Sequence, residues 1–171
     1  LAKNLGEMVK EIRKIRKEKL AVITNSSLLH RPDVQRDLRS VDFVMAKLDA
    51  STQDLFLKVN RPMQDIRISQ ILKGIKEFRA GYKGKFALQI MFIEENKIYV
   101  DRIARLVKEI SPDQVQINTP LRPCETRPLP KEDIDIIKKY FEGMDIASVY
   151  EGKAVSVKAF NKEDTLRRRG E

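Results

Sequence analysis

Four apolar runs, each followed by polar residues and separated by helical patterns, constrain the fold of this chain more than any other feature. The runs are AVITNSSLL (21–29), FVMAKLDAST (43–52), FALQIMFIEEN (86–96) and VQINTPLRP (115–123). Strands that alternate with amphipathic helices predict an α/β fold with a parallel sheet. Ligands of such sheets bind at the carboxyl ends of the strands. The polar residues after each run are therefore the candidate site.

The composition bounds the size and the partners of the protein. Its 171 residues, 42% of them hydrophobic, suffice for one ordinary core. Lys and Arg outnumber Asp and Glu by 34 to 25, and the +9 charge favours an anionic partner. Nucleic acid is favoured over a membrane, because no apolar stretch approaches the roughly 20 residues of a spanning helix. One cysteine, Cys124, and no secretory pattern predict a reducing, cytoplasmic location.

Periodicity and turn residues place the helices and strands. We expect strands at 20–24, 43–48, 85–93 and 114–118, and helices at 5–17, after Pro32, and at 53–59, 68–78 and 100–110. These elements predict a partial (βα) barrel over residues 1–130. Residues 131–171 are predicted to be a C-terminal extension with a helix (132–141), a strand (154–160) and a helix that begins at 165. Because the chain opens on a helix, the leading strands are expected upstream of residue 1.

Four motifs resemble those of a known family in their order and spacing. They are TNSSLL (24–29), KLDA (47–50), VNRP (59–62) and INTPLRP (117–123). Together they resemble the barrel of radical S-adenosylmethionine (SAM) iron-sulfur enzymes, in the branch similar to wyosine-type transfer-RNA (tRNA) synthases. The resemblance implies the later strands of a six-stranded barrel. The family's CxxxCxxC loop, which holds a four-iron four-sulfur (4Fe-4S) cluster, is not in this sequence. Upstream truncation is the preferred explanation, and a degenerate homologue is the alternative.

The resemblance implies that SAM binds at the strand ends. Asn25 has a short polar group suited to the ribose diol, and Lys47 has an ammonium suited to the carboxylate, at a position where the family often has Ser. The strand that ends at Met91 or Phe92 resembles the family strand beside adenine. The predicted SAM-binding residues are Asn25, Ser26, Lys47, Asp49, Met91 and Asn118.

Each of these residues also has a structural interpretation. Asn25 is a common residue of a turn after a strand. Lys47 and Asp49 are two residues apart in a strand, so they share a face and could form an ion pair. Met91 is of a type that most often packs in a core. The sequence leaves these alternatives open.

Three further residues are predicted to contact the substrate or an anion. Arg61 follows a helix and could bind a carboxylate or phosphate as a fork, although Asn60-Arg61-Pro62 could also be only a helix end. Thr119 could meet the substrate next to Asn118, and Arg122 could neutralise a phosphate. His30 is more readily explained as a cap or solvated side chain than as a catalytic group.

A basic helix at residues 10–19 and the arginines at 167–169 predict contact with an RNA backbone, although such a face is most often only solvated. We therefore expect the carboxyl-terminal portion of a radical SAM oxidoreductase, which cleaves SAM to a deoxyadenosyl radical and uses an external electron donor. A base of tRNA is the expected substrate, and this chain alone is predicted to be inactive. The alternatives are a glycyl-radical activating enzyme and a non-catalytic basic module that binds RNA or a protein.

Overall fold

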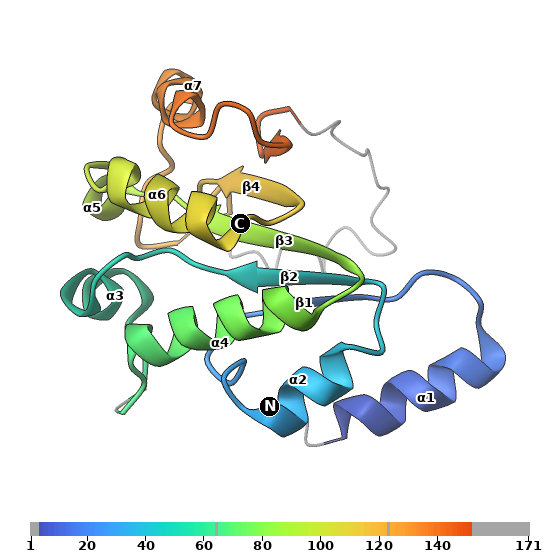
Figure 1. Ribbon diagram of the computed structural model, residues 1–171. Helices are drawn as coiled ribbons and strands as arrows, with labels where there is room; N and C mark the ends of the chain where they lie inside the picture. Colours follow the sequence, from blue (N-terminus) through green and yellow to red (C-terminus); the bar gives the residue numbers. More distant parts are fainter. Residues whose placement is uncertain (1–3, 64, 123, 152–171) are drawn as a thin grey trace, which may run out of the picture.

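The computed structural model describes residues 4–63, 65–122 and 124–151, and it confirms the predicted α/β fold with a parallel sheet (Figure 1). The strands lie in the order β1-β2-β3-β4-β5, and neighbouring strands all pair in parallel. Each crossover therefore adds the next strand on the same side, as in a barrel. The strands are β1 (Ala21–Thr24), β2 (Phe43–Lys47), β3 (Lys85–Met91), β4 (Gln114–Asn118) and β5 (Ile146–Ser148).

Helices connect the strands and cover one face of the sheet. Helix α1 packs beside α2, and α4 packs beside α6 in front of the sheet (Figure 1). Helices α3 and α5 contact each other at the end of the sheet towards which β2 points. The helices are α1 (Leu5–Ile15), α2 (Pro32–Leu38), α3 (Gln53–Asn60), α4 (Ile68–Gly81), α5 (Glu94–Lys97), α6 (Val100–Ile110) and α7 (Lys131–Lys139).

Local signals in the sequence set several helix boundaries. Thr52 caps α3, because its hydroxyl oxygen accepts a hydrogen bond from the Leu55 N–H at 3.3 Å. Pro32 begins α2, at a position where its missing N–H costs nothing. In α6, Ile103 and Val107 lie one turn apart and are both buried. The apolar face of α6 therefore packs on the sheet.

The two faces of the sheet differ in character. Val44, Phe86, Leu88, Ile90 and Val115 belong to the core that the helices share. Because side chains alternate along a strand, the residues between them point to the opposite face, which we call the inner face. Lys47, Gln89 and Gln116 lie across from one another on it. Helix packing therefore anchors the sheet from one side, and the other side carries this polar row next to apolar residues such as Met45 and Ala87.

The amino edge of the sheet is tied to α1 through Asp42. One carboxylate oxygen of Asp42 accepts a hydrogen bond from the Leu20 N–H at 2.7 Å and another from the Arg13 guanidinium. These two contacts lower the pKa of Asp42, and the backbone N–H of Leu20 has the larger effect.

Within the described residues, no helix is long and apolar enough to cross a membrane.

Some elements differ from those predicted. Strand β3 ends at Met91, not Ile93, because the Asn96 side chain accepts the Ile93 N–H at 2.8 Å in place of a strand partner. Helix α5 and strand β5 were not predicted, since elements of four and three residues are too short to show a period. The predicted strand at 154–160 and the helix from 165 lie outside the described residues. The division of the chain at residue 130 remains a prediction.

Candidate functional site

The structure brings the predicted site residues of four strands to one edge of the sheet. Asn25 follows β1, Lys47 ends β2, Met91 ends β3 and Asn118 ends β4. Met91 and Asn118 are direct partners in the β3–β4 register. Neighbouring strands lie about 4.8 Å apart, so the four ends span roughly 14 Å. We call this carboxyl edge the rim; the roles of its residues in SAM binding remain predictions.

Asp49 is the most deeply buried charged group at the rim, with 1% of its side chain exposed. One carboxylate oxygen accepts the Met91 N–H at 2.8 Å, and the other accepts the Asn60 amide at 2.6 Å. The same oxygen lies 3.4 Å from the Lys47 ammonium, so the ion pair considered from the sequence is present. Asp49 therefore ties β2, β3 and α3 together, and its carboxylate is fully engaged within the chain.

Asn96 is a fully buried residue that the sequence interpretation missed. Its amide nitrogen donates to the backbone oxygens of Asp49 and Met91, both at 2.9 Å, while its oxygen accepts the Ile93 N–H. It thereby fixes the carboxyl ends of β2 and β3 relative to each other. An Asn at the third position of a short helix after a strand was the available signal, but a helix of one turn has no visible period.

A cleft of about 430 Å³ opens beside the rim, between β2 and helices α3 and α4. Its polar side contains Asn25, Lys47, Asp49 and Asn60. Its apolar wall consists of Leu48, Phe56, Pro62, Met63, Ile66, Ile68 and Ile71. Lys47, with 30% of its side chain exposed, is the cation that lies between the cleft and the inner face.

Arg61 also lines the cleft; it is the C-cap that follows α3, in a left-handed conformation with φ of 44°. Its guanidinium donates to the Glu125 carboxylate at 3.0 Å, and both side chains are largely exposed. An exposed pair of this kind is weak. Arg61 is thus able to exchange Glu125 for an incoming anion.

Two other predicted contacts are engaged in structural hydrogen bonds. The Ser26 hydroxyl is fully buried and donates to the Lys47 backbone oxygen at 2.9 Å, which joins β1 to β2. The Thr119 hydroxyl oxygen accepts the Leu129 N–H at 2.8 Å, which holds Leu129 against the end of β4. Each hydroxyl has a structural partner here, and ligand contact by either residue remains a prediction.

The inner face has a row of polar side chains just below the rim. Lys47, Gln89 and Gln116 are register partners on β2, β3 and β4. The Gln89 amide donates to the Gln116 side-chain oxygen at 3.2 Å and approaches the Met45 sulfur at 3.4 Å. The row places one cation beside two linked amides.

The remaining candidates lie apart from the rim contacts. His30 packs where α4 comes closest to the loop before α2, since a Cβ on Gly74 would lie 2.4 Å from the His30 backbone nitrogen. Cys124 is exposed, and its thiol approaches the Thr126 backbone oxygen. Arg122 is also exposed. In the described ranges, no three His, Cys, Asp or Glu side chains are grouped to hold a metal ion.

Comparison of the sequence with characterised families and curated proteins gives relatives of greater length. No protein-family model matches the chain. It is 31% identical over 177 residues to a GTPase Obg of Brachyspira hyodysenteriae, covering 97% of this chain and 26% of that protein. It is 34% identical to a UPF0026 protein of Methanocaldococcus jannaschii (70% and 38% covered) and 35% identical to one of Synechocystis (77% and 49%). The chain thus spans between a quarter and half of these relatives.

Solved structures share the fold at low sequence identity. A domain of pyruvate-formate lyase-activating enzyme from Bacteroides vulgatus superposes with a TM-score of 0.69 and 13% identity, covering 86% of this chain and 94% of that domain. SuiB of Streptococcus suis gives 0.61 at 14% identity (86% and 36% covered). A radical SAM methyltransferase of Sphaerobacter thermophilus gives 0.57 at 18% identity (75% and 39%). The chain therefore has the partial-barrel fold found in radical SAM enzymes.

Proposed function

We propose that this chain is the carboxyl-terminal portion of a radical SAM iron-sulfur oxidoreductase whose substrate is a base of tRNA. The observation that carries the proposal is the rim: a parallel partial barrel, shared with a radical SAM methyltransferase, collects a cation and amides at its carboxyl edge. Ligands of parallel α/β folds bind at that edge. The motifs TNSSLL and KLDA, which resemble the family, lie on it.

The chemistry of the rim fits SAM. The Lys47 ammonium would bind the carboxylate, the amides of Asn25 and Asn118 would bind hydroxyl or ring nitrogen groups, and Met91 would contact adenine. Bound to a 4Fe-4S cluster that donates one electron, SAM would be cleaved to methionine and the deoxyadenosyl radical. The sequence has one cysteine, so the cluster ligands are proposed to lie outside it. Within the chain, Asp49 and Asn96 hold Lys47 and Met91 in place.

The full-length protein tests this proposal. Reconstituted with iron and sulfide without oxygen, and given a reductant as electron donor, it is expected to release 5'-deoxyadenosine from SAM. Equilibrium dialysis should show that Lys47→Gln weakens SAM binding about tenfold, as expected for loss of one charge-assisted contact. Lys58→Gln, at an exposed position of α3, is the matched control. An intact cluster without turnover, or equal SAM binding by both variants, would contradict the proposal.

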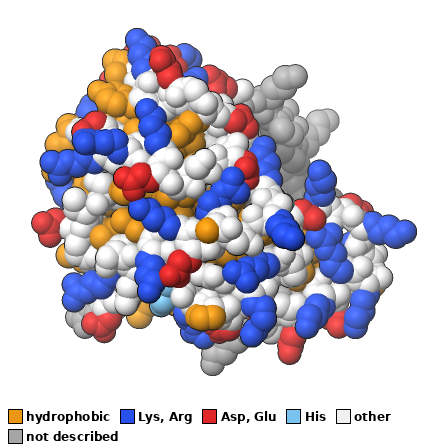
Figure 2. All heavy atoms as spheres, in the orientation of Figure 1, with side chains coloured by type: hydrophobic (Ala, Val, Ile, Leu, Met, Phe, Trp, Pro, Cys, Tyr) orange, Lys and Arg blue, Asp and Glu red, His pale blue; other side chains and the backbone are white. Residues whose placement is uncertain are grey.

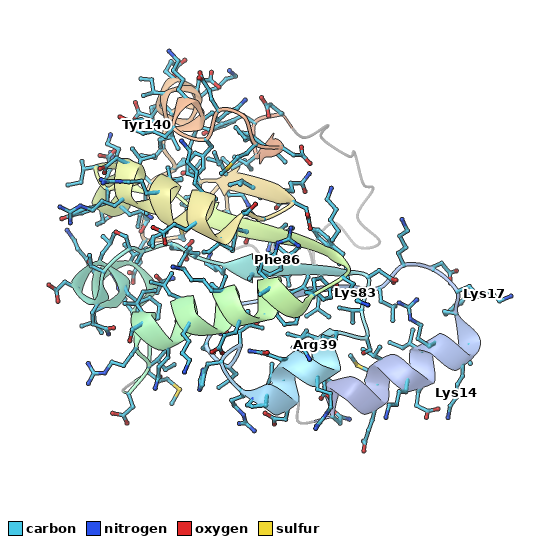
Figure 3. The ribbon with its side chains drawn as sticks, in the orientation of Figure 1. Lys14, Lys17, Arg39, Lys83, Phe86 and Tyr140 are labelled. Atoms are coloured by element: carbon cyan, nitrogen blue, oxygen red, sulfur yellow. The ribbon has the colours of Figure 1, made fainter. Side chains whose placement is uncertain are left out.

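A polyanionic substrate is supported by the charge of the helical face. Figure 2 shows Lys and Arg side chains spread over this face. Lys14 of α1 and Lys17, which follows it, lie at the end of the molecule opposite α3, and Arg39 after α2 and Lys83 before β3 lie between that end and α3 (Figure 3). These cations would contact phosphates without reading sequence. Binding of tRNA to the full-length protein should then fall steeply between about 50 and 200 mM salt.

A second candidate has support from one comparison. The partial-barrel neighbour that this chain covers almost completely is a domain of a pyruvate-formate lyase-activating enzyme. Activation of a glycyl-radical protein by the same SAM chemistry is therefore the alternative. It predicts that a glycine-containing protein partner, and not tRNA, increases deoxyadenosine release.

Two other functions receive less support. A non-catalytic basic module is expected if the gene upstream of Leu1 encodes no CxxxCxxC. The GTPase name of the Brachyspira relative is not carried over, because that protein is four times longer than the match and this sequence has no GxxxxGK[ST] phosphate loop.

A further inference from the structure

Among the described residues, the linked amides on the inner face leave two hydrogen-bonding groups without a partner. The Gln89 nitrogen donates to the Gln116 oxygen, and neither the Gln89 oxygen nor the Gln116 nitrogen has a partner among the described residues. Both side chains are half-buried, and neither free atom is a buried unsatisfied group. The pair therefore has one acceptor and one donor that no residue in the described part of the chain engages.

This result does not depend on which way the two amides are turned. If both amides rotated by 180°, the Gln116 nitrogen would donate to the Gln89 oxygen, and one donor and one acceptor would still be free. The Met45 sulfur, a weak acceptor at 3.4 Å, favours the orientation with the Gln89 nitrogen next to it. A ligand that matches the pair must offer an N–H and an acceptor on one edge.

We infer that Gln89 and Gln116 bind the Watson–Crick edge of a nucleobase. Every base carries a donor beside an acceptor on that edge, which enzymes that act on a base read through hydrogen bonds. A single trans peptide group, in contrast, has its N–H and C=O on opposite sides. The inference rests on the proposed function, and it names the substrate group and the residues that recognise it.

The position of the pair separates substrate from cofactor. Lys47 is one strand away from Gln89 and two strands away from Gln116 in the same row. The cofactor carboxylate at Lys47 therefore lies over β2, and the base lies over β3 and β4. Asp49, the buried carboxylate next to the row, is already bonded to Met91 and Asn60. The Lys47 ammonium, 3.4 Å away, also partly compensates its charge, so a neutral base fits the row better.

The test measures binding of the four ribonucleosides to the full-length protein with SAM, by saturation-transfer difference NMR. At least one nucleoside is expected to bind competitively with tRNA. If uridine binds, 3-methyluridine, which lacks the only ring N–H and keeps both carbonyls, should bind at least tenfold more weakly. An extended tripeptide, N-acetyl-Gly-Ala-Gly-amide, is the competing ligand.

Substitutions connect the binding to the two glutamines. Gln116→Glu keeps an oxygen that accepts from Gln89 but replaces the free donor with an acceptor, so nucleoside binding should fall at least tenfold. Gln116→Met removes both groups and should give the same loss if Glu disturbs folding. Gln70→Glu, on the exposed side of α4, is the control with the same chemical change. Circular dichroism melting checks each variant.

The outcomes distinguish this inference from the proposed function. Lys47→Gln should weaken SAM and spare the nucleoside, whereas Gln116→Glu should do the reverse. SAM binding without any nucleoside binding, tripeptide binding in place of nucleosides, or an unchanged affinity in Gln116→Glu would overturn the inference alone. Nucleoside binding that depends on Gln116 in a protein that does not bind SAM would overturn only the proposed function.

Discussion

Replacing Asp49 by Asn tests whether one buried carboxylate holds the rim together. The two side chains have the same shape, so the change removes charge and one acceptor without creating a cavity. If the new amide keeps its oxygen on the Met91 N–H, its NH2 group faces Asn60, whose side-chain amide has to turn over to present its oxygen. The variant therefore loses the hydrogen bonds to a charged group and the ion pair with Lys47, and it moves the Asn60 amide nitrogen to the buried place of the Asn60 oxygen.

The expected loss follows from these contacts. A hydrogen bond to a charged group contributes about 1.5–3 kcal/mol, and the attraction of Lys47, which is 30% exposed, adds up to about 1 kcal/mol. We expect Asp49→Asn to lower the free energy of unfolding by about 3 kcal/mol. With a urea m-value of about 2 kcal/mol per M, the midpoint should fall by roughly 1.5 M.

The assay is urea unfolding of the chain, followed by far-ultraviolet circular dichroism. Lys47→Met should cost only about 1 kcal/mol, because Asp49 keeps both N–H donors. The double variant Asp49→Asn with Asn60→Asp restores a hydrogen bond between an amide N–H and a carboxylate, and it should recover at least half of the loss. A midpoint shift below about 0.3 M for Asp49→Asn, or no recovery in the double variant, would refute the account of the rim.

Three further predictions concern the scaffold. Gly74→Ala would place a Cβ 2.4 Å from a backbone nitrogen of the loop before α2, so thermal unfolding should show a loss of about 2–3 kcal/mol, whereas Gly81→Ala, near only a flexible guanidinium, should be neutral or stabilising. Thr119→Val removes the acceptor of a buried N–H, so it should cost about 1–2 kcal/mol and speed proteolysis within 120–130; unchanged proteolysis would count against this hydrogen bond. Burial, and then the charges of nearby carboxylates, raise the pKa of Tyr82 to about 12. Since the folded pKa exceeds the unfolded value near 10, this stabilisation is complete below pH 10 and is lost as the pH rises to 12. The pH dependence of urea unfolding between those values should be smaller in Tyr82→Phe.

The strands and helices show which elements the local sequence pattern can predict. Strand β4 and helix α6 have the predicted boundaries, because their periods of two and 3.6 are carried by consecutive residues. Strand β5 has three residues and is defined by its pairing with β4, which no local period reveals. The sequence could therefore predict the elements that bury a full apolar face. It could not predict a strand that is defined only by its hydrogen bonds to a neighbouring strand.

The site residues divide in the same way. Polar residues at the strand ends, such as Asn25, Lys47 and Asn118, were predicted together because parallel strands bring their carboxyl ends to one edge. The sequence did not predict which of these polar side chains form hydrogen bonds within the protein. Thr119 has the same local signal as Asn118, yet its hydroxyl is engaged with a backbone N–H ten residues further along the chain.

The amino-acid sequence by itself determined the alternation of strands and helices, the parallel sheet and the polar rim, because each depends on residues that are close in the chain. Tertiary structure decided which polar groups are used. Asp49 receives the N–H of a residue 42 positions away, and Gln89 meets Gln116 across 27 positions, only because the strand register aligns them. Hydrogen bonds act over about 3 Å, so a shift of one residue in register would turn these side chains to the opposite face and remove the contacts.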